Sequence, residues 1–300
     1  MSEPPDLLTL RKLAIVRQVY LTATRQRGQP TAVSRLIAVV EYDLAIETVL
    51  KSVLAALQRR ALGGDFADLI KQVRAALAAK GLPDLPRADA VQRVRSIRNA
   101  AQHEGRLPTI EEADECHVIA RGFLDATLGL VWDLSLDGIS LAGLIADDAS
   151  RARIAEGEQH LASDNKKVAV EKAGEALEWA LLRVKNALVG RGDPWARAIL
   201  TEDAFGKPKA SREMTASIQR TQETVLYLAL GLDYGELVRF RGVAGSVVFT
   251  LDGGAAHYGM KDGLNDADAE LALAYAAEAL VQIESRVGTI DKPFGRDRWY

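Results

Sequence analysis

Apolar residues recur every three or four positions along most of the chain, which is the spacing of one face of a helix. No stretch of the first half alternates apolar and polar residues in the manner of a strand. The pattern therefore predicts a helical protein, with helices over these segments: 7–24, 31–60, 65–79, 89–102, 111–132, 165–189, 211–230, 232–251 and 265–286.

The helix expected over 111–132 has the clearest start signal. Thr109 stands before it and Glu112 follows three residues later, which fits a capping box in which each side chain accepts from the other residue's backbone N–H. Gly105 and Pro108 break the preceding helix. The sequence therefore predicts a helix–loop–helix join at this point.

The helical pattern pauses after the first half of the chain and then restarts. Gly138 and Gly143 lie in the pause, and a charged run follows them. We expect two domains with a connection between them. The expected bounds are 1–134 for the first domain, 135–160 for the connection, 161–288 for the second domain and 289–300 for a tail.

The second domain resembles the first. Ala45-Ile46-Glu47 corresponds to Ala176-Leu177-Glu178, and each tripeptide lies near the centre of a long predicted helix. Further on, residues 97–105 align with residues 251–259, and an acidic helix start follows both segments. We interpret this correspondence as an internal duplication.

One segment of the second domain is ambiguous. Residues 243–250 fit a short strand, whereas the wider pattern over 232–251 fits a helix. We favour the helix by analogy with the first domain.

Composition and charge are those of an ordinary folded protein. Of the 300 residues, 48% are hydrophobic and 26% are charged, and the formal net charge is −3. This acidic balance argues against a constitutive DNA coat, although a small basic site remains compatible with it.

Cellular location follows from three further features. Cys116 is the only cysteine, so no internal disulfide can form. The first residues lack the basic-then-apolar order of a secretion signal, and no apolar run is long enough to span a membrane. We expect a cytoplasmic protein with no membrane partner.

One short segment carries the only grouping of arginine, amide and histidine, namely Arg98-Asn99-Ala100-Ala101-Gln102-His103. Arg98, Asn99 and His103 resemble the R-x4-6-H signature of HEPN domains, which are helical bundles that include many ribonucleases. The resemblance implies an all-α fold of two tandem HEPN-like helical bundles, the second of them degenerate. It also implies an endoribonuclease of a stress, phage-defence or toxin type.

The residue types suit the chemistry that the resemblance implies. The histidine moves a proton while the ribose 2′-hydroxyl attacks the adjacent phosphate, which leaves a 2′,3′-cyclic phosphate and a 5′-hydroxyl end. Imidazole acts as acid or base near neutral pH, and guanidinium donates to phosphate oxygens as charge develops. We expect catalytic roles for Arg98, Asn99 and His103, with no metal and no cofactor.

Helix geometry limits how these residues can meet. Arg98 and His103 lie roughly 140° apart around a helix, whereas Asn99 and His103 share a face. The arginine must reach around the helix, the helix must loosen near Gly105, or two domains must share the site. A shared site agrees with the resemblance, in which two motifs face each other and supply two histidines.

Two shared arrangements remain open. The second copy of the motif holds Asp252 and Gly253 at the arginine and asparagine positions, and only His257 remains. An intramolecular pseudo-dimer would pair the first motif with His257. A homodimer of two N-terminal domains would restore two full motifs, and we favour it for that reason.

Other charged residues surround the motif. Arg93, Arg95 and Arg106 have few acidic residues between them, which predicts a small RNA-binding patch, and solvated arginines are the alternative. Glu47 falls inside an apolar stripe, where a carboxylate is costly unless it is paired. Either Glu47 reaches water at the edge of the stripe, or it pairs with an arginine of the Arg98 region and orients it.

The same residues also fit a function without catalysis. An arginine and a histidine at this spacing occur by chance, and many HEPN-like domains bind nucleotides or proteins instead of cleaving RNA. The alternative is a helical interaction module, either adaptor- or antitoxin-like or a nucleotide-binding bundle. Under the ribonuclease hypothesis, the expected partners are RNA, a second copy of the chain and a regulatory protein.

Overall fold

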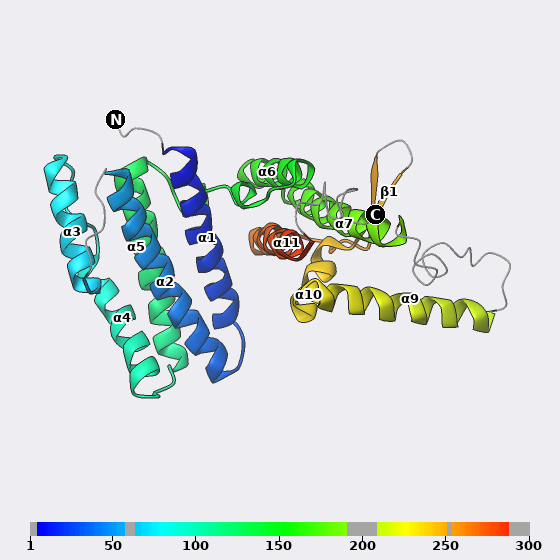
Figure 1. Cartoon of the computed structure of the whole chain (residues 1–300), viewed down its shortest axis with the longest axis horizontal. Coiled ribbons are helices and arrows are strands. Elements are labelled where there is room, and N and C mark those ends of the chain that lie inside the picture. Colours follow the sequence, from blue (N-terminus) through cyan, green and yellow to red (C-terminus); the bar gives the residue numbers. More distant parts are fainter. Residues whose placement is uncertain (1–4, 58–63, 191–208, 251–253, 288–300) are drawn as a thin grey trace, which may run out of the picture. The chain divides into compact units, whose positions relative to one another are not determined.

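The computed structural model describes residues 5–57, 64–190, 209–250 and 254–287 (Figure 1). The chain divides into two compact units, Met1–Gly143 and Leu144–Tyr300, called unit 1 and unit 2 below. Helices dominate both, and the only sheet among the described residues has two strands. The predicted all-α class is confirmed. No helix within the described ranges is long and apolar enough to cross a membrane.

Unit 1 is a helical bundle with α2 at its centre. The helices have these bounds: α1 Leu7–Arg27, α2 Ala32–Ala56, α3 Phe66–Ala79, α4 Ala88–His103 and α5 Ile110–Trp132. Helix α2 packs against each of the other four, as its central position in Figure 1 indicates. Tyr42, Ile46 and Val49 of α2 are fully buried and form the middle of the core.

The predicted capping box at the start of α5 is confirmed. The hydroxyl oxygen of Thr109 accepts from the backbone N–H of Glu112 at 3.2 Å, and the carboxylate of Glu112 accepts from the backbone N–H of Thr109 at 3.1 Å. These two bonds satisfy backbone donors that a helix start leaves unpaired. They fix the point at which the chain turns from α4 into α5.

Helix α2 presents apolar residues on two sides. Its inner side holds the core residues, but Val33, Ile37 and Leu44 are exposed by 59%, 39% and 49%. These three residues lie within about 40° of one another around the helix. They form an apolar outer face on α2, which we call the α2 outer face.

Unit 2 contains a second set of helices and the small sheet. Its elements have these bounds: α6 Asp148–Ala162, α7 Lys166–Gly190, α9 Lys209–Ala229, α10 Tyr234–Ala244, β1 Ser246–Phe249, β2 Ala255–Tyr258 and α11 Asp266–Val287, with a short 3-10 helix at Ala142–Leu144 before them. Helix α7 packs against α6, α10 and α11. Gly157 of α6 permits close packing there, because a Cβ would meet Leu273 of α11 and the backbone of Ala169.

Two segments of unit 2 differ from the sequence prediction. The second half of the expected connection, 135–160, is the helix α6, and its Ile154 is fully buried. The helix favoured over 232–251 is confirmed over Tyr234–Ala244, which is α10, and is wrong beyond it, because β1 follows. Gly245 makes this break with a φ of +68°, and Ser246–Phe249 then pairs with β2 in antiparallel register.

The two units share a coarse order of elements. Each begins with two packed helices, the second of which has 25 residues, and each ends with a helix that packs against that long helix. An internal duplication would produce such an order, and the duplication itself stays a prediction.

Candidate active site on helix α4

The motif occupies the last turns of α4, which lies between α2 and α5. Val94, Ile97 and Ala101 face the core and are buried. Asn99 and His103 lie on the opposite side and are exposed. Helix geometry places them about 40° apart, so both belong to one outer strip of α4. His103 is the last residue of the helix.

Arg98 lies beside this strip, toward α2. Its side chain is 24% exposed, and its Nη1 donates to the Oδ1 of Asn99 at 3.0 Å. Its Nε lies 3.7 Å from the Oδ2 of Asp43 on α2. The arginine is therefore held between a neighbour on its own helix and a carboxylate of the central helix.

Asp43 is the residue of this site that sequence reasoning missed. Its side chain is only 5% exposed, its Oδ2 accepts from Arg95, and its Oδ1 has no hydrogen-bond partner. Burial raises the pKa of this carboxyl, and the positive charges of Arg95 and Arg98 oppose that rise. The available signal was a carboxylate within an apolar stripe, which is the signal that pointed to Glu47.

Glu47 lies one turn further along α2 and contacts Arg95 instead of Arg98. Its Oε2 is 3.3 Å from Arg95 Nη1, and its Oε1 accepts from Lys51 at 2.6 Å. Arg95 also lies over the ring of Phe66, 5.0 Å from its centroid. These contacts fasten α3 and α4 to α2, and they leave Arg95 only 23% exposed.

Arg93 and Arg106 lie on the other side of the strip, toward α5. Arg106 donates from both Nη atoms to the carboxylate of Glu112, at 2.8 and 3.2 Å. Arg93 donates to Glu115 at 3.1 Å, and its Nη2 is 3.8 Å from Glu112. Both arginine side chains remain about half exposed, at 48%.

In the folded structure, neighbouring carboxylates therefore offset the positive charge of the predicted RNA-binding patch. Few acidic residues separate these arginines in the sequence, but carboxylates reach them from α2 and α5. Each arginine predicted to bind RNA, namely Arg93, Arg95 and Arg106, has at least one carboxylate partner. The exposed strip of Asn99 and His103 runs between these two rows of ion pairs.

His257, the other predicted contributor, lies on β2 of unit 2. Its Nε2 is 3.4 Å from the carboxylate of Glu175 on α7, and both side chains are 12% exposed. A largely buried imidazole that faces a carboxylate presents little surface to a substrate. Asp252 and Gly253, its neighbours in the predicted motif copy, lie outside the described residues.

The matched glutamates of the predicted repeat have comparable partners. Glu47 contacts Arg95 of α4, and Glu178 of α7 accepts from Arg241 of α10 at 2.8 Å. Arg241 also donates to the hydroxyl of Tyr227 at 2.8 Å. In each unit, a glutamate of the 25-residue helix thus pairs with an arginine of the second-last helix, which is α4 in unit 1 and α10 in unit 2.

A histidine outside the motif lies in a tyrosine cluster of unit 1. The Nδ1 of His117 on α5 is 3.1 Å from the hydroxyl of Tyr20 and 2.9 Å from that of Tyr42. Burial and the charge of Arg27 lower the pKa of His117, while Asp114 opposes this. The cluster joins α1, α2 and α5, and no local pattern in the sequence indicates it.

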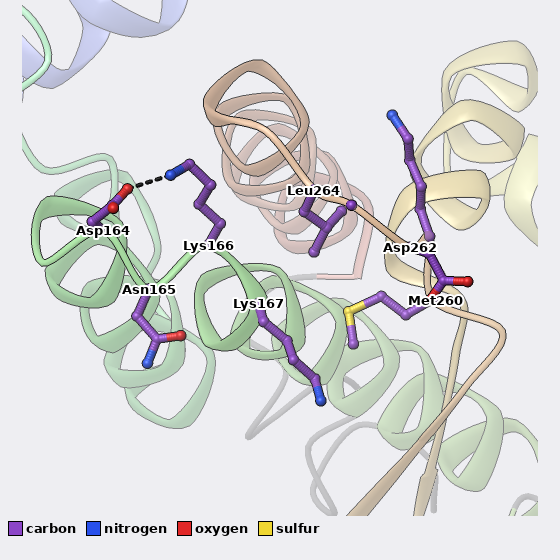
Figure 2. A pocket seen from close by; sticks show the side chains of 9 residues that line it. Asp164, Asn165, Lys166, Lys167, Met260, Asp262 and Leu264 are labelled. Atoms are coloured by element: carbon purple, nitrogen blue, oxygen red, sulfur yellow. Dashed lines mark hydrogen bonds and ion pairs between the residues drawn. The ribbon is translucent and has the colours of Figure 1, made fainter.

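Figure 2 shows a pocket of about 470 Å³ in unit 2, at the start of α7. Lys166, Lys167 and Lys261 line it, but each has a carboxylate neighbour, at 3.2, 3.9 and 2.8 Å from Asp266, Glu171 and Asp268. The pocket therefore offers no surplus of positive charge. Elsewhere in the described ranges, no group of three or more His, Cys, Asp or Glu side chains could hold a metal ion.

Comparison with known proteins adds no relative: no family model matches the chain, and neither the curated proteins nor the solved structures include a significant match.

Proposed function

We propose that the chain is a metal-independent endoribonuclease of the HEPN type. In this proposal two tandem HEPN-like bundles form the chain, and the first carries the active motif. His103 moves the proton during attack of a ribose 2′-hydroxyl on the adjacent phosphate. Arg98 donates to the phosphate oxygens as negative charge develops, and Asn99 holds the phosphate or orients the imidazole.

The observation that carries the proposal is the arrangement of the three motif residues at the end of α4. Asn99 and His103 are exposed on one strip, and Arg98 donates to Asn99 and lies 3.7 Å from Asp43. An arginine with restricted freedom and an accessible histidine are what phosphate binding and proton transfer require. Arg98 and His103 lie about 140° apart around α4, so the proposal requires either that the Arg98 side chain reaches around the helix or that a second motif faces the first.

A second copy of the chain completes the site in this proposal. One motif has a single histidine, whereas two facing motifs supply one group as base and another as acid. The α2 outer face, formed by Val33, Ile37 and Leu44, lies on the same helix as Asp43, the carboxylate that contacts Arg98. Exposed apolar patches mark association sites, and a two-fold contact pairs such a face with itself. The burial of His257 favours this homodimer over pairing within one chain.

Cleavage of RNA in the presence of EDTA tests the activity. The parent protein and a His103→Ala variant are incubated with mixed RNA, beside a His160→Ala variant as a matched control, because His160 is a partly exposed histidine of unit 2. We expect His103→Ala to reduce the rate by about 10²- to 10⁴-fold and His160→Ala to leave it unchanged. Equal cleavage by parent and His103→Ala contradicts the proposal.

A second candidate function is a helical interaction module that neither binds nor cleaves RNA. The neutral charge around α4 favours it, because RNA affinity depends on phosphate neutralisation. The α2 outer face would then serve association alone. A stable dimer in sedimentation measurements, without RNA cleavage or RNA binding at low salt, supports this module.

A further inference from the structure

Glu112 and Glu115 hold the two most exposed arginines beside the motif. Glu112 engages both Nη atoms of Arg106, which is the forked geometry that a phosphate group also uses. Glu115 engages the Nε of Arg93 at 3.1 Å. A carboxylate and a phosphate cannot occupy the same donors of one guanidinium at once. RNA that uses these donors must therefore displace the glutamates.

We propose that Glu112 and Glu115 occupy the donors of Arg93 and Arg106 and keep them from RNA until a polyanion displaces the two glutamates. We call this pair of glutamates the acidic lock. This inference rests on the proposed function, because it assumes that RNA approaches the α4 strip. The lock restrains binding without closing the site, since Asn99 and His103 stay exposed.

Stability alone does not account for this arrangement. Both arginine side chains are 48% exposed, whereas Glu112 is 13% exposed and Glu115 is 44% exposed. The pair of Arg93 and Glu115 therefore contributes little to folding, and the forked pair of Arg106 and Glu112 contributes more. Glu112 has a structural role in the capping box, but a neutral glutamine also fills that role. The negative charge of Glu115 therefore contributes little to the fold, and the charges of both glutamates determine how the surface meets an anion.

The lock also indicates which anion can open it. Two arginines and two glutamates have no net charge, so a single phosphate gains little by replacing one carboxylate. A strand of RNA offers several adjacent phosphates and releases counterions from each one that is neutralised. The lock therefore selects extended RNA over mononucleotides, and the parent protein should bind RNA weakly.

Binding of a fluorescein-labelled single-stranded RNA, followed by anisotropy over a range of salt concentrations, tests the lock. All proteins carry His103→Ala, so that the probe stays intact. Glu112→Gln and Glu115→Gln each remove one lock charge. Glu111→Gln is the matched control, because Glu111 is an exposed neighbour in the same helix turn and its removal changes the net charge equally.

We expect each lock variant to bind RNA about two- to fivefold more tightly than the control. The slope of log K against log salt should become steeper by about 0.7 for each arginine that is released. The affinity for a mononucleotide such as AMP should change little. Circular dichroism shows whether the glutamine variants keep the helical content of the parent.

The outcomes separate the lock from the activity. If Glu112→Gln and Glu115→Gln match Glu111→Gln while the protein with His103 intact cleaves RNA, the lock is wrong and the proposed function stands. If no variant binds RNA at low salt and the protein with His103 intact does not cleave it, both are wrong. Tighter binding with an unchanged salt slope also contradicts the lock.

Discussion

Replacement of Asp43 by asparagine tests how the site is built. Asp43→Asn keeps the size of the side chain and removes its charge. Arg98 then loses its only carboxylate contact among the described residues, which is the one at 3.7 Å. Arg95 keeps Glu47 at 3.3 Å and the ring of Phe66. The substitution therefore acts on both arginines, because Arg95 loses the charge of its closest acceptor and Arg98 loses its carboxylate neighbour.

The expected loss of stability is small. Removal of one partner from a fully buried ion pair costs about 3–5 kcal/mol, whereas an exposed pair contributes about 0–1 kcal/mol. Arg95 and Arg98 are 23% and 24% exposed, so water can solvate both after the substitution. Burial also raises the pKa of Asp43, which means that its ionisation already opposes folding. We therefore expect a loss of about 1 kcal/mol.

The expected loss of activity is larger. A misplaced catalytic group reduces rates by up to about 10²-fold, so RNA cleavage should fall by about 10- to 100-fold. Glu47→Gln is the matched control, because Glu47 is an acid one turn away on α2 that contacts Arg95 and Lys51 but not Arg98. It should change the rate less than about threefold.

Urea unfolding and the rate of RNA cleavage are measured on the same preparations. A drop in cleavage for Asp43→Asn but not for Glu47→Gln, with an unfolding free energy for Asp43→Asn within about 1 kcal/mol of the parent's, supports the positioning role. The reasoning is refuted if Asp43→Asn cleaves at the parent rate, or if Glu47→Gln reduces cleavage to the same degree.

Three further predictions concern pH and the fold. The pKa of His117 lies below its ordinary value of 6.5, so the stability linked to it is present above about pH 6.5 and is lost as the pH falls toward the lowered pKa. His117→Gln should therefore make the urea midpoint depend less on pH between about pH 7 and about pH 5. An unchanged slope of the midpoint against pH contradicts this. Gly245→Ala should destabilise unit 2 by about 1–3 kcal/mol, because a Cβ there meets the backbone of Tyr258. Gly259 has a similar φ but lies in open space, so Gly259→Ala should destabilise unit 2 less. Thermal unfolding of the two variants measures the difference. Glu284→Ala removes the acceptor of the backbone N–H groups of Ala146 and Asp147, at 2.9 and 2.8 Å, and should lower the unfolding free energy by about 1–3 kcal/mol in urea titrations; a parent-like value contradicts that role.

Local signals explain what the sequence predicted well. The helix expected over 89–102 corresponds to α4, Ala88–His103, and the capping box at Thr109 is present. Both depend on spacing and on residues within one turn, which a sequence displays directly. The exposure of Asn99 and His103 follows from the same helical spacing, because Ile97 and Ala101 occupy the buried side.

Long-range packing decided the rest. The carboxylate partners of the arginines come from residues 52 and 22 positions away, as Arg95–Asp43 and Arg93–Glu115 show. No local pattern reveals such pairs. The ambiguous segment 243–250 became a strand because Gly245 ends α10 and Val247 packs beside Gly174 of α7. The charged run before residue 160 belongs to α6 and to its N-cap Asp147 rather than to a connection.

The chemistry of cleavage at one defined phosphate tests the proposed activity without relying on any variant. An RNA oligonucleotide and the same strand with a single 2′-deoxy substitution at the cleaved position are incubated with the parent protein in EDTA, and the product ends are identified by mass spectrometry. We expect a 2′,3′-cyclic phosphate and a 5′-hydroxyl from the RNA and no cleavage of the substituted strand at that position. Equal cleavage of the two strands, or a 5′-phosphate end, would contradict the proposed activity.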